Sequence, residues 1–191
     1  CITACKRSLY LQVICVRCNR GCNTEFYGYQ ETYNSKINQI ILPQIVTNYI
    51  ELHICRKTDK GDMFLLLKRS DNAKIYPGIW QMITGTIESH EHTKDTVIRE
   101  LAEETGLEPS KIFSIPRVNT FYLAISDKIC MSPVFLTIVE NEEVIISDEH
   151  SEYKWVSYEL AKDMIHWPNQ ADSLEIIRRY LDDKDLFSKL V

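Results

Sequence analysis

Carboxylates gather in one short stretch of this 191-residue chain, the run from Arg99 to Glu104. Residues three and four apart share a face of an α-helix, so a helix here places Glu100, Glu103 and Glu104 on one patch. Neighbouring carboxylates repel one another and raise each other's pKa unless a cation offsets the repulsion. Ligand sets made only of oxygen suit Mg²⁺ or Mn²⁺. The spacing therefore indicates a site for a divalent metal ion.

The same helix needs an apolar side that anchors it to a core. At about 100° per residue, four residues fall on a different arc from the glutamates, and they are Val97, Ile98, Leu101 and Thr105. The helical periodicity runs from Glu91 to Thr105, and Gly106 follows as a residue that can take the left-handed conformation that ends a helix. We therefore predict one helix that is buried on one side and carries the carboxylates on the other.

A charged run of this kind is usually a solvated helix face, and for an isolated run that explanation is the simpler one. Here the run is tied by fixed offsets to flanking residues, in the pattern Gly85-x5-Glu91-x7-Arg99-Glu100-Leu101-x-Glu103-Glu104-x-Gly106-Leu107. A solvated face predicts no such offsets. The pattern matches the Nudix box at every defining position, and the chain therefore resembles the Nudix hydrolase family.

The resemblance has implications for both fold and chemistry. It implies an α/β (α+β) fold, the Nudix-type α/β/α sandwich around a mixed β-sheet, and the order of predicted elements from about Ile45 to Leu190 is compatible with it. It also implies Mg²⁺ (or Mn²⁺) as the cofactor. The expected reaction is attack of a metal-activated water on a phosphorus of a polyphosphate.

The box residues acquire roles from the same resemblance. The metal ligands are expected to be Glu100, Glu103, Glu104, the carbonyl of Gly85 and, outside the box, Glu149. Glu149 also has a plainer interpretation as a surface residue of an acidic pair with Asp148. The residues expected to take part in catalysis are Glu100, Glu103, Arg99 and Glu149. Glu100 and Glu149 are alternatives for the general base, and the sequence leaves that choice open.

Two residues of the box are expected to be structural. Glu91 is the expected ion-pair partner of Arg99, a pair that fixes the loop before the helix, and a phosphate contact is the alternative role for Arg99. Gly106 ends the helix. Two positions depart from the family pattern: His90 stands where glycine commonly precedes the box glutamate, and His92 where serine or threonine often caps the helix. Thr93 is the expected substitute for that cap.

Segments outside the box narrow the resemblance to one group within the family. The stretch Trp80 to Glu88, and later Glu149 to Trp155 and Trp167 to Gln170, are similar to the dihydroneopterin triphosphate pyrophosphatase and dATP pyrophosphohydrolase group. This implies cleavage of a dATP-like nucleoside triphosphate or of dihydroneopterin triphosphate to the monophosphate and pyrophosphate. Oxidised dGTP, ADP-ribose and dinucleoside polyphosphates are alternative substrates. A non-catalytic Nudix module is disfavoured because the box carboxylates are all present.

Three residues are candidates for substrate binding. Trp80 offers a flat apolar face for a purine or pterin ring, and Gln81 offers a paired donor and acceptor. Arg69, at the end of a predicted strand, is within reach of a phosphate. Each has a plainer interpretation, since aromatic residues in strands usually belong to the core and basic residues at strand ends are commonly solvated.

The elements that position these residues follow from periodicity and turn signals. Strands are expected near residues 45–55, 63–67, 80–83, 115–125, 132–140 and 153–156. Helices are expected at 91–105, 158–165 and 170–181, with Pro168 able to start the last of them.

Composition excludes several classes of protein. With 45% hydrophobic and 26% charged residues the chain suits one globular domain, and its net charge of −5 argues against nucleic acid as a partner. No apolar run approaches the roughly 20 residues that span a bilayer, so we expect no membrane partner. The expected partner is a small nucleotide or pterin triphosphate, and the oligomeric state stays open.

The cysteines are distributed unevenly along the chain. Five of seven cysteines lie within the first 22 residues, whereas the rest of the chain holds only Cys55 and Cys130, a pattern typical of a cytoplasmic protein. Residues 1–42 are expected to be a polar, Cys-rich extension outside the core, and 43–191 the Nudix hydrolase domain. Zinc binding by the early cysteines is a weaker alternative, because the run Cys15-x-x-Cys18-x-x-x-Cys22 lacks the two Cys-x-x-Cys pairs of a zinc ribbon or finger.

Overall fold

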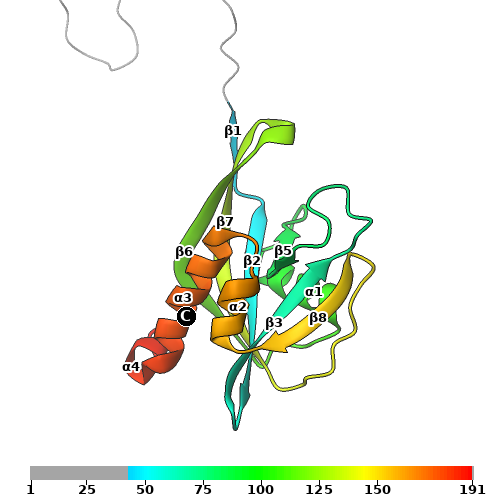
Figure 1. Ribbon diagram of the computed structural model, residues 1–191. Helices are drawn as coiled ribbons and strands as arrows, with labels where there is room; N and C mark the ends of the chain where they lie inside the picture. The colour runs from blue at the N-terminus through cyan, green and yellow to red at the C-terminus, as the bar shows by residue number, and fades with distance from the viewer. Residues whose placement is uncertain (1–42, 191) are drawn as a thin grey trace, which may run out of the picture. The chain divides into compact units, whose positions relative to one another are not determined.

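A mixed β-sheet is the framework of the computed structural model, which describes residues 43–190 (Figure 1). Its strands are β1 (Gln44–Val46), β2 (Tyr49–Thr58), β3 (Gly61–Arg69), β4 (Trp80–Gln81), β5 (Ile83–Thr86), β6 (Lys111–Leu123), β7 (Lys128–Val139) and β8 (His150–Val156). The expected extension 1–42, its cysteines and the zinc alternative lie outside the described residues. Among the described residues, no helix has the length and apolar character to cross a membrane.

The central strand is β2, which pairs in parallel with β7 and antiparallel with β3 and β5. Strand β1 also pairs in parallel with β7, β6 lies on the other side of β7, and β8 pairs antiparallel with β3. The strand expected over 45–55 is therefore two strands, broken at Thr47-Asn48, where the carbonyl of Asn48 accepts a hydrogen bond from the backbone of Ile87.

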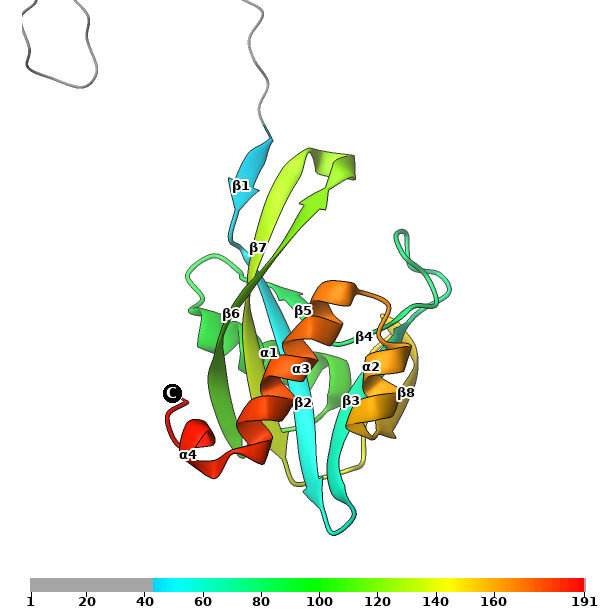
Figure 2. The same cartoon turned by 60° about the vertical axis from the view of Figure 1, so that its left-hand side comes forward.

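Helices cover both faces of the sheet. They are α1 (Thr93–Thr105), α2 (Tyr158–Met164), α3 (Pro168–Asp182) and α4 (Lys184–Phe187), with a 3₁₀ turn η1 (Ala124–Ser126) between β6 and β7. Figures 1 and 2 show α2 and α3 on one side of the sheet and α1 on the other. The expected α/β/α sandwich with a mixed sheet is confirmed. The short helix α4 was not expected from the sequence.

Strand β2 is buried on both faces, and each face contributes side chains to a separate hydrophobic core. Ile50, Leu52 and Ile54 belong to the core under α1, which also contains Val97 and Leu101. The other face of β2 presents Glu51, His53 and Cys55, and the second core there joins Cys55 to residues of α2 and α3, including Ala161, Leu174 and Ile177. Because side chains alternate along a strand, each of these faces receives every second residue.

Helix α1 shows where periodicity was right and where it was wrong. Val97, Leu101 and Thr105 are buried as expected, but Ile98 is 41% exposed, so the apolar arc is narrower than predicted. The helix ends as expected at Gly106, with a φ of 66°. It begins at Thr93, two residues later than expected, because Glu91 is engaged in the preceding loop. Thr93 is therefore not the cap; His92 occupies that position without a side-chain cap hydrogen bond.

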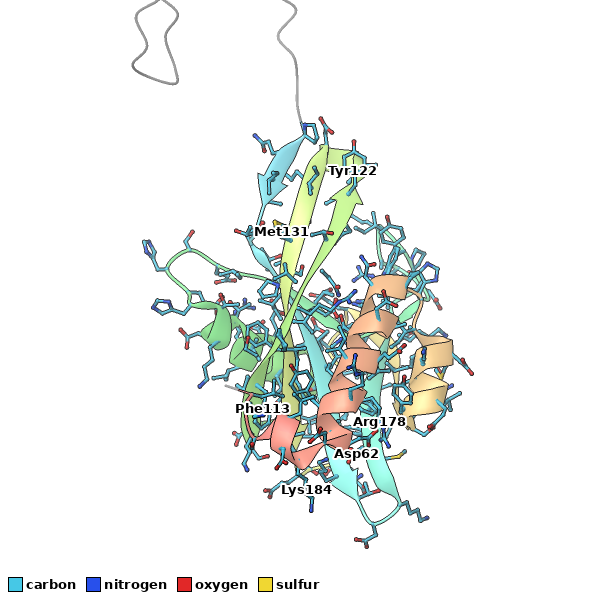
Figure 3. All side chains as sticks on the ribbon, turned by 90° about the vertical axis from the view of Figure 1, so that its left-hand side faces the viewer. Asp62, Phe113, Tyr122, Met131, Arg178 and Lys184 are labelled. Carbon is cyan, nitrogen blue, oxygen red and sulfur yellow. The ribbon has the colours of Figure 1, made fainter. Side chains whose placement is uncertain are left out.

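The last third of the chain holds smaller corrections. Strand β8 begins at His150, earlier than expected, and α3 begins at Pro168, the residue predicted to be able to start it. Helix α3 is tied to the β2–β3 hairpin by Arg178, whose Nη1 lies 4.0 Å from Oδ2 of Asp62 (Figure 3). Tyr122 lies near the tip of the β6–β7 hairpin, where its hydroxyl donates to Asp127 at 2.9 Å (Figure 3).

We predict that a chain beginning at Pro43 folds, because both cores consist of residues within 50–190. Thermal melts followed by circular dichroism, on the full chain and the shortened one, measure this. The two melting temperatures should agree within about 3 °C, a shift that corresponds to less than about 1 kcal/mol for a domain of this size. A shortened chain that is insoluble or lacks a cooperative transition contradicts the prediction.

Candidate active site

Arg99 of α1 is the most connected side chain of the predicted site. Its Nε and Nη2 atoms donate to the two carboxylate oxygens of Glu91 at 2.9 and 3.0 Å, a bidentate pair. The Nη2 atom also donates to the carbonyl of Thr86 at 3.0 Å. The Nη1 atom lies 3.0 Å from Oε1 of Glu100 and 3.0 Å from Oε2 of Glu103. The expected Arg99–Glu91 pair is therefore present. The hydrogen bond to Glu91 raises the pKa of Arg99, so the guanidinium stays charged.

Glu91 fastens the loop that precedes α1. Besides Arg99, its carboxylate accepts from the Thr96 hydroxyl at 2.7 Å and from the Glu88 backbone at 3.1 Å. The hydrogen bonds from Arg99, and then from Thr96, lower the pKa of Glu91 from 4.5 to about 2. One residue earlier, His90 has a φ of 72°. The glycine-like conformation is thus adopted although the residue is a histidine.

Gly85 and Glu100 are matched in shape. A Cβ built on Gly85 would overlap the Cγ, Cδ and Oε1 atoms of Glu100, so only glycine allows this glutamate to lie against β5. Burial raises the pKa of Glu100, and the hydrogen bond from Arg99 opposes that rise. A mostly buried carboxylate, whose side chain is 12% exposed, is thereby held between β5 and Arg99.

Glu104 is the most buried carboxylate of the helix, with 6% of its surface exposed. Its Oε2 lies 2.7 Å from Nε2 of His150, which is also buried. Burial raises the pKa of Glu104, and the hydrogen bond with His150 opposes that rise. His150 was not among the residues expected from the sequence, because the strand that carries it was expected to begin only at Tyr153.

Glu149 lies immediately before β8, and its side chain is exposed. Its negative charge contributes to the raised pKa of Glu104, so the two carboxylates are electrostatic neighbours. Its backbone carbonyl accepts from the Ser70 backbone at 2.8 Å, which fixes the start of β8 against the end of β3. The structure therefore brings Glu149 to the same side as the box glutamates.

The expected convergence of three carboxylates on one patch is only partly right. Within residues 43–190, no three Asp, Glu, His or Cys side chains are arranged so that they could hold a metal ion. The reason is visible in the contacts: Arg99 engages Glu100 and Glu103, and Glu104 is turned to His150. The chemistry of the set nevertheless fits a hard divalent cation, since its donors are all oxygens and the absent side chain of Gly85 leaves Glu100 room at the strand.

The three expected substrate-binding residues lie on the neighbouring strands β3 and β4, where the backbone of Arg69 donates to the carbonyl of Ile79 at 2.9 Å. Arg69, at the end of β3, is the cross-strand partner of His150, and its buried Nε has no hydrogen-bond partner in the described part of the chain. Gln81 is buried opposite Leu67. Trp80 packs against the core on the α2–α3 side, and the Lys154 ammonium lies 4.8 Å from its ring centre.

An aromatic pair that the sequence reading missed lies at the start of α3. Tyr76, half exposed and with a φ of 53°, packs edge-on against Trp167, with ring centres 4.7 Å apart. The backbone of His166 donates to the carbonyl of Trp80 at 2.9 Å, which joins this region to β4. The run Tyr76-Pro77-Gly78 has the composition of a turn, and the aromatic residue inside it is the one signal that the sequence offers for this pair.

Comparisons with known proteins agree with this geometry. Residues 52–180 match the family model described as the NUDIX domain. Dihydroneopterin triphosphate diphosphatase of Haemophilus influenzae is 31% identical over 159 residues, which cover 77% of this chain and 96% of that protein. Nucleoside triphosphatase NudI of Escherichia coli is 28% identical over 122 residues, 60% of this chain and 84% of that protein.

Solved structures lead to the same family. The crystal structure of the MutT protein from Methanosarcina mazei superposes with a TM-score of 0.60 and 31% identity, covering 75% of this chain and 99% of that one. The dihydroneopterin triphosphate pyrophosphohydrolase of Escherichia coli shares the fold, with a TM-score of 0.56 and 20% identity over 71% of this chain and 95% of that one.

The Glu91–Arg99 pair should stabilise the fold less as the pH falls. The pKa of Glu91 is lower in the folded chain, about 2, than its ordinary 4.5, so its contribution to stability is complete above pH 4.5 and is lost as the pH falls toward 2. We expect the difference in unfolding free energy between wild type and Glu91→Gln to shrink over that window, as measured by urea denaturation from pH 7 to pH 3. Glu88→Gln, in the same loop, is the matched control. A difference that is constant with pH contradicts the pairing.

The second prediction concerns Gly85. We expect Gly85→Ala to lower the unfolding free energy by about 1 kcal/mol or more, the usual cost of overpacking. In a Glu100→Ala background, which lacks the overlapping atoms, the same change should cost less than about half as much. Urea denaturation of the four chains gives this coupling. Equal costs in both backgrounds would show that the two residues do not share this space.

Proposed function

Because the chain belongs to the Nudix family, we propose that it is a Mg²⁺-dependent pyrophosphohydrolase of dihydroneopterin triphosphate or a dATP-like nucleoside triphosphate, which it converts to the monophosphate and pyrophosphate. The observation that carries the proposal is the assembled box, in which Arg99 joins Glu91, Glu100 and Glu103 beside Gly85. The substrate class is supported by the named activity of the 31% identical relative, which this chain matches over 96% of that protein's length.

The proposed ligands of the divalent ion are Glu100, Glu103, Glu104, the carbonyl of Gly85 and Glu149. Hydrolases of this family generally use divalent ions, and Mg²⁺ or Mn²⁺ suits an all-oxygen donor set. When bound, such an ion supplies an activated water and neutralises charge on the phosphates. Glu103 is 60% exposed, so its carboxylate is free to turn from Arg99 toward a cation.

Glu100 is our choice for the general base, ahead of Glu149. A base must be held within hydrogen-bond reach of the proton that it takes. Glu100 is held from two sides, by Arg99 and by its fit against Gly85, whereas the side chain of Glu149 is exposed. Arg99 itself acts by positioning the glutamates and by offsetting their mutual repulsion.

Arg69 is the proposed phosphate contact. It is the cross-strand partner of His150, which binds Glu104, and its Nε has no partner among the described residues. A guanidinium in this place has donors left for phosphate oxygens, and arginine binds phosphate in a bidentate manner. The distal phosphates of the substrate would then lie between Arg69 and the box.

For the ring of the substrate there are two candidate surfaces. Trp80 and Gln81 are the residues proposed from the sequence, although Lys154 lies over the Trp80 ring. The half-exposed Tyr76 beside Trp167 is the second surface. Aromatic faces at both places suit a purine or a pterin. Trp80→Leu and Tyr76→Leu distinguish them, because loss of the true ring contact raises KM, whereas loss of a packing contact alone lowers the free energy of unfolding and leaves KM unchanged.

We predict that Glu103→Gln and Glu104→Gln each lower kcat by at least about a hundredfold at saturating Mg²⁺, since each removes a charged ligand of the ion. Initial rates with pyrophosphate detection measure this. Glu108→Gln, an exposed glutamate just beyond α1, is the control and should keep kcat within about twofold. Full kcat in both box variants would show that α1 is not the site.

We predict a substrate order in which dihydroneopterin triphosphate and dATP precede oxidised dGTP, and oxidised dGTP precedes ADP-ribose. The measurement is kcat/KM across these compounds at fixed Mg²⁺, with products separated by chromatography. Pyrophosphate and the monophosphate are the expected products. A preference of about tenfold or more for ADP-ribose, which corresponds to roughly 1.4 kcal/mol, contradicts the proposed substrate, and so does release of orthophosphate.

A further inference from the structure

A buried histidine binds one of the box glutamates. The side chains of His150 and Glu104 are 1% and 7% exposed, and His150 Nε2 lies 2.7 Å from Glu104 Oε2. An ionised carboxylate offers only acceptors, so the imidazole is the donor in this hydrogen bond. The other imidazole nitrogen, Nδ1, is buried and has no partner within residues 43–190. Among those residues, the hydrogen bond to Glu104 is therefore the one that orients this ring.

The contact joins the end of α1 to the start of β8. Around it, the backbone of Ser147 donates to the carbonyl of Glu104 at 3.4 Å, and the backbone of His150 donates to Ser147 at 3.1 Å. The backbone of Ile145 also donates to Thr105 at 2.8 Å. Three backbone hydrogen bonds thus fix the segment that carries His150, so the imidazole is presented to Glu104 by a rigid support.

We propose that His150 is a positioning residue for the metal site: its Nε2–H engages Oε2 of Glu104 and so leaves Oε1 for the divalent cation. This inference rests on the proposed function, in which Glu104 is a ligand. A carboxylate on a flexible chain loses rotational freedom when it binds an ion, and a hydrogen bond that fixes its orientation beforehand reduces that loss. Removal of such a partner typically weakens metal affinity about 10- to 100-fold.

The chain contains a matched pair that separates this role from a structural one. His53 Nε2 lies 2.8 Å from Glu51 Oε1, both side chains are buried, and His53 Nδ1 also lacks a partner among the described residues. This pair lies on β2, on the face opposite α1. It has the same imidazole–carboxylate contact and burial as His150–Glu104, without a box residue, and Glu51 also accepts a hydrogen bond from Asn119 at 2.7 Å.

The experiment measures the Mn²⁺ affinity of the full chain without substrate, by electron paramagnetic resonance titration. The variants differ in whether the side chain at position 150 is long enough to donate to Glu104. Glutamine places an amide near the position of imidazole Nε2, whereas asparagine is too short. We expect His150→Gln to keep the dissociation constant within about threefold, and His150→Asn to weaken binding by about tenfold or more. His53→Gln and His53→Asn should leave Mn²⁺ affinity unchanged, and circular dichroism verifies that each variant is folded.

The outcomes separate the two proposals. A wild-type chain that binds no Mn²⁺ overturns the proposed metal site and this inference together. Wild-type binding with equal affinity in folded His150→Asn overturns the inference alone, and so does an equal loss of affinity in His53→Asn. Should His150→Asn fail to fold, the wild-type chain gives the test: Mg²⁺ must shift the imidazole ¹H–¹⁵N resonances of His150 and leave those of His53 in place. An unshifted His150 refutes the positioning role.

Discussion

The guanidinium of Arg99 contacts Glu91, Glu100, Glu103 and the carbonyl of Thr86, so a single side chain ties the loop, β5 and α1 together. Lysine could not replace it, because the contacts need several donors in one plane, and the pair with Glu91 is bidentate. The same positive charge offsets the repulsion between the like-charged carboxylates of Glu100 and Glu103. The positions of Glu100 and Glu103 on the helix therefore depend on this contact, whereas Glu104 is engaged by His150.

Burial of Glu100 and Glu104 disfavours their charged forms, which the neighbouring hydrogen bonds favour. Desolvation raises the pKa of both Glu100 and Glu104, which means that the fold holds their charged forms at a cost in stability. Two well-packed cores offset that cost. The core under α1 anchors the helix through Val97 and Leu101, and the second core holds α2 and α3 on the opposite face of β2. Buried carboxylates with raised pKa are typical of sites that bind cations or move protons.

Among the described residues, positive φ angles at non-glycine positions occur at Asp127 in the β6–β7 turn and in two other loops. His90 and Tyr76 have positive φ angles of 72° and 53°, a conformation that costs a non-glycine residue about 1 kcal/mol. His90 precedes Glu91, whose ion pair with Arg99 fixes that loop, and Tyr76 packs on Trp167. In both places a specific contact next to the strained residue holds the conformation. Such strain is common where a loop must present a side chain to a ligand.

The sequence by itself determined the features that are local along the chain. The helix, its end at Gly106 and the Arg99–Glu91 pair lie within one loop-helix unit, and the periodicity of α1 and the offsets of the box are enough to infer them. The face on which α1 packs also follows, except at Ile98, since an amphipathic helix buries its apolar arc. The order of strands and helices was predicted for the same reason, although their bounds were off by a few residues.

Only the tertiary structure decided which distant residues meet. Glu104 and His150 are 46 residues apart, and their contact depends on where β8 begins and on its register with β3. The same register places Lys154 over Trp80 and Arg69 opposite His150. A slip of one residue would turn every side chain of the strand to the other face of the sheet. Periodicity can indicate that a strand has two faces, but the packing of the whole sheet selects which residues across it become partners.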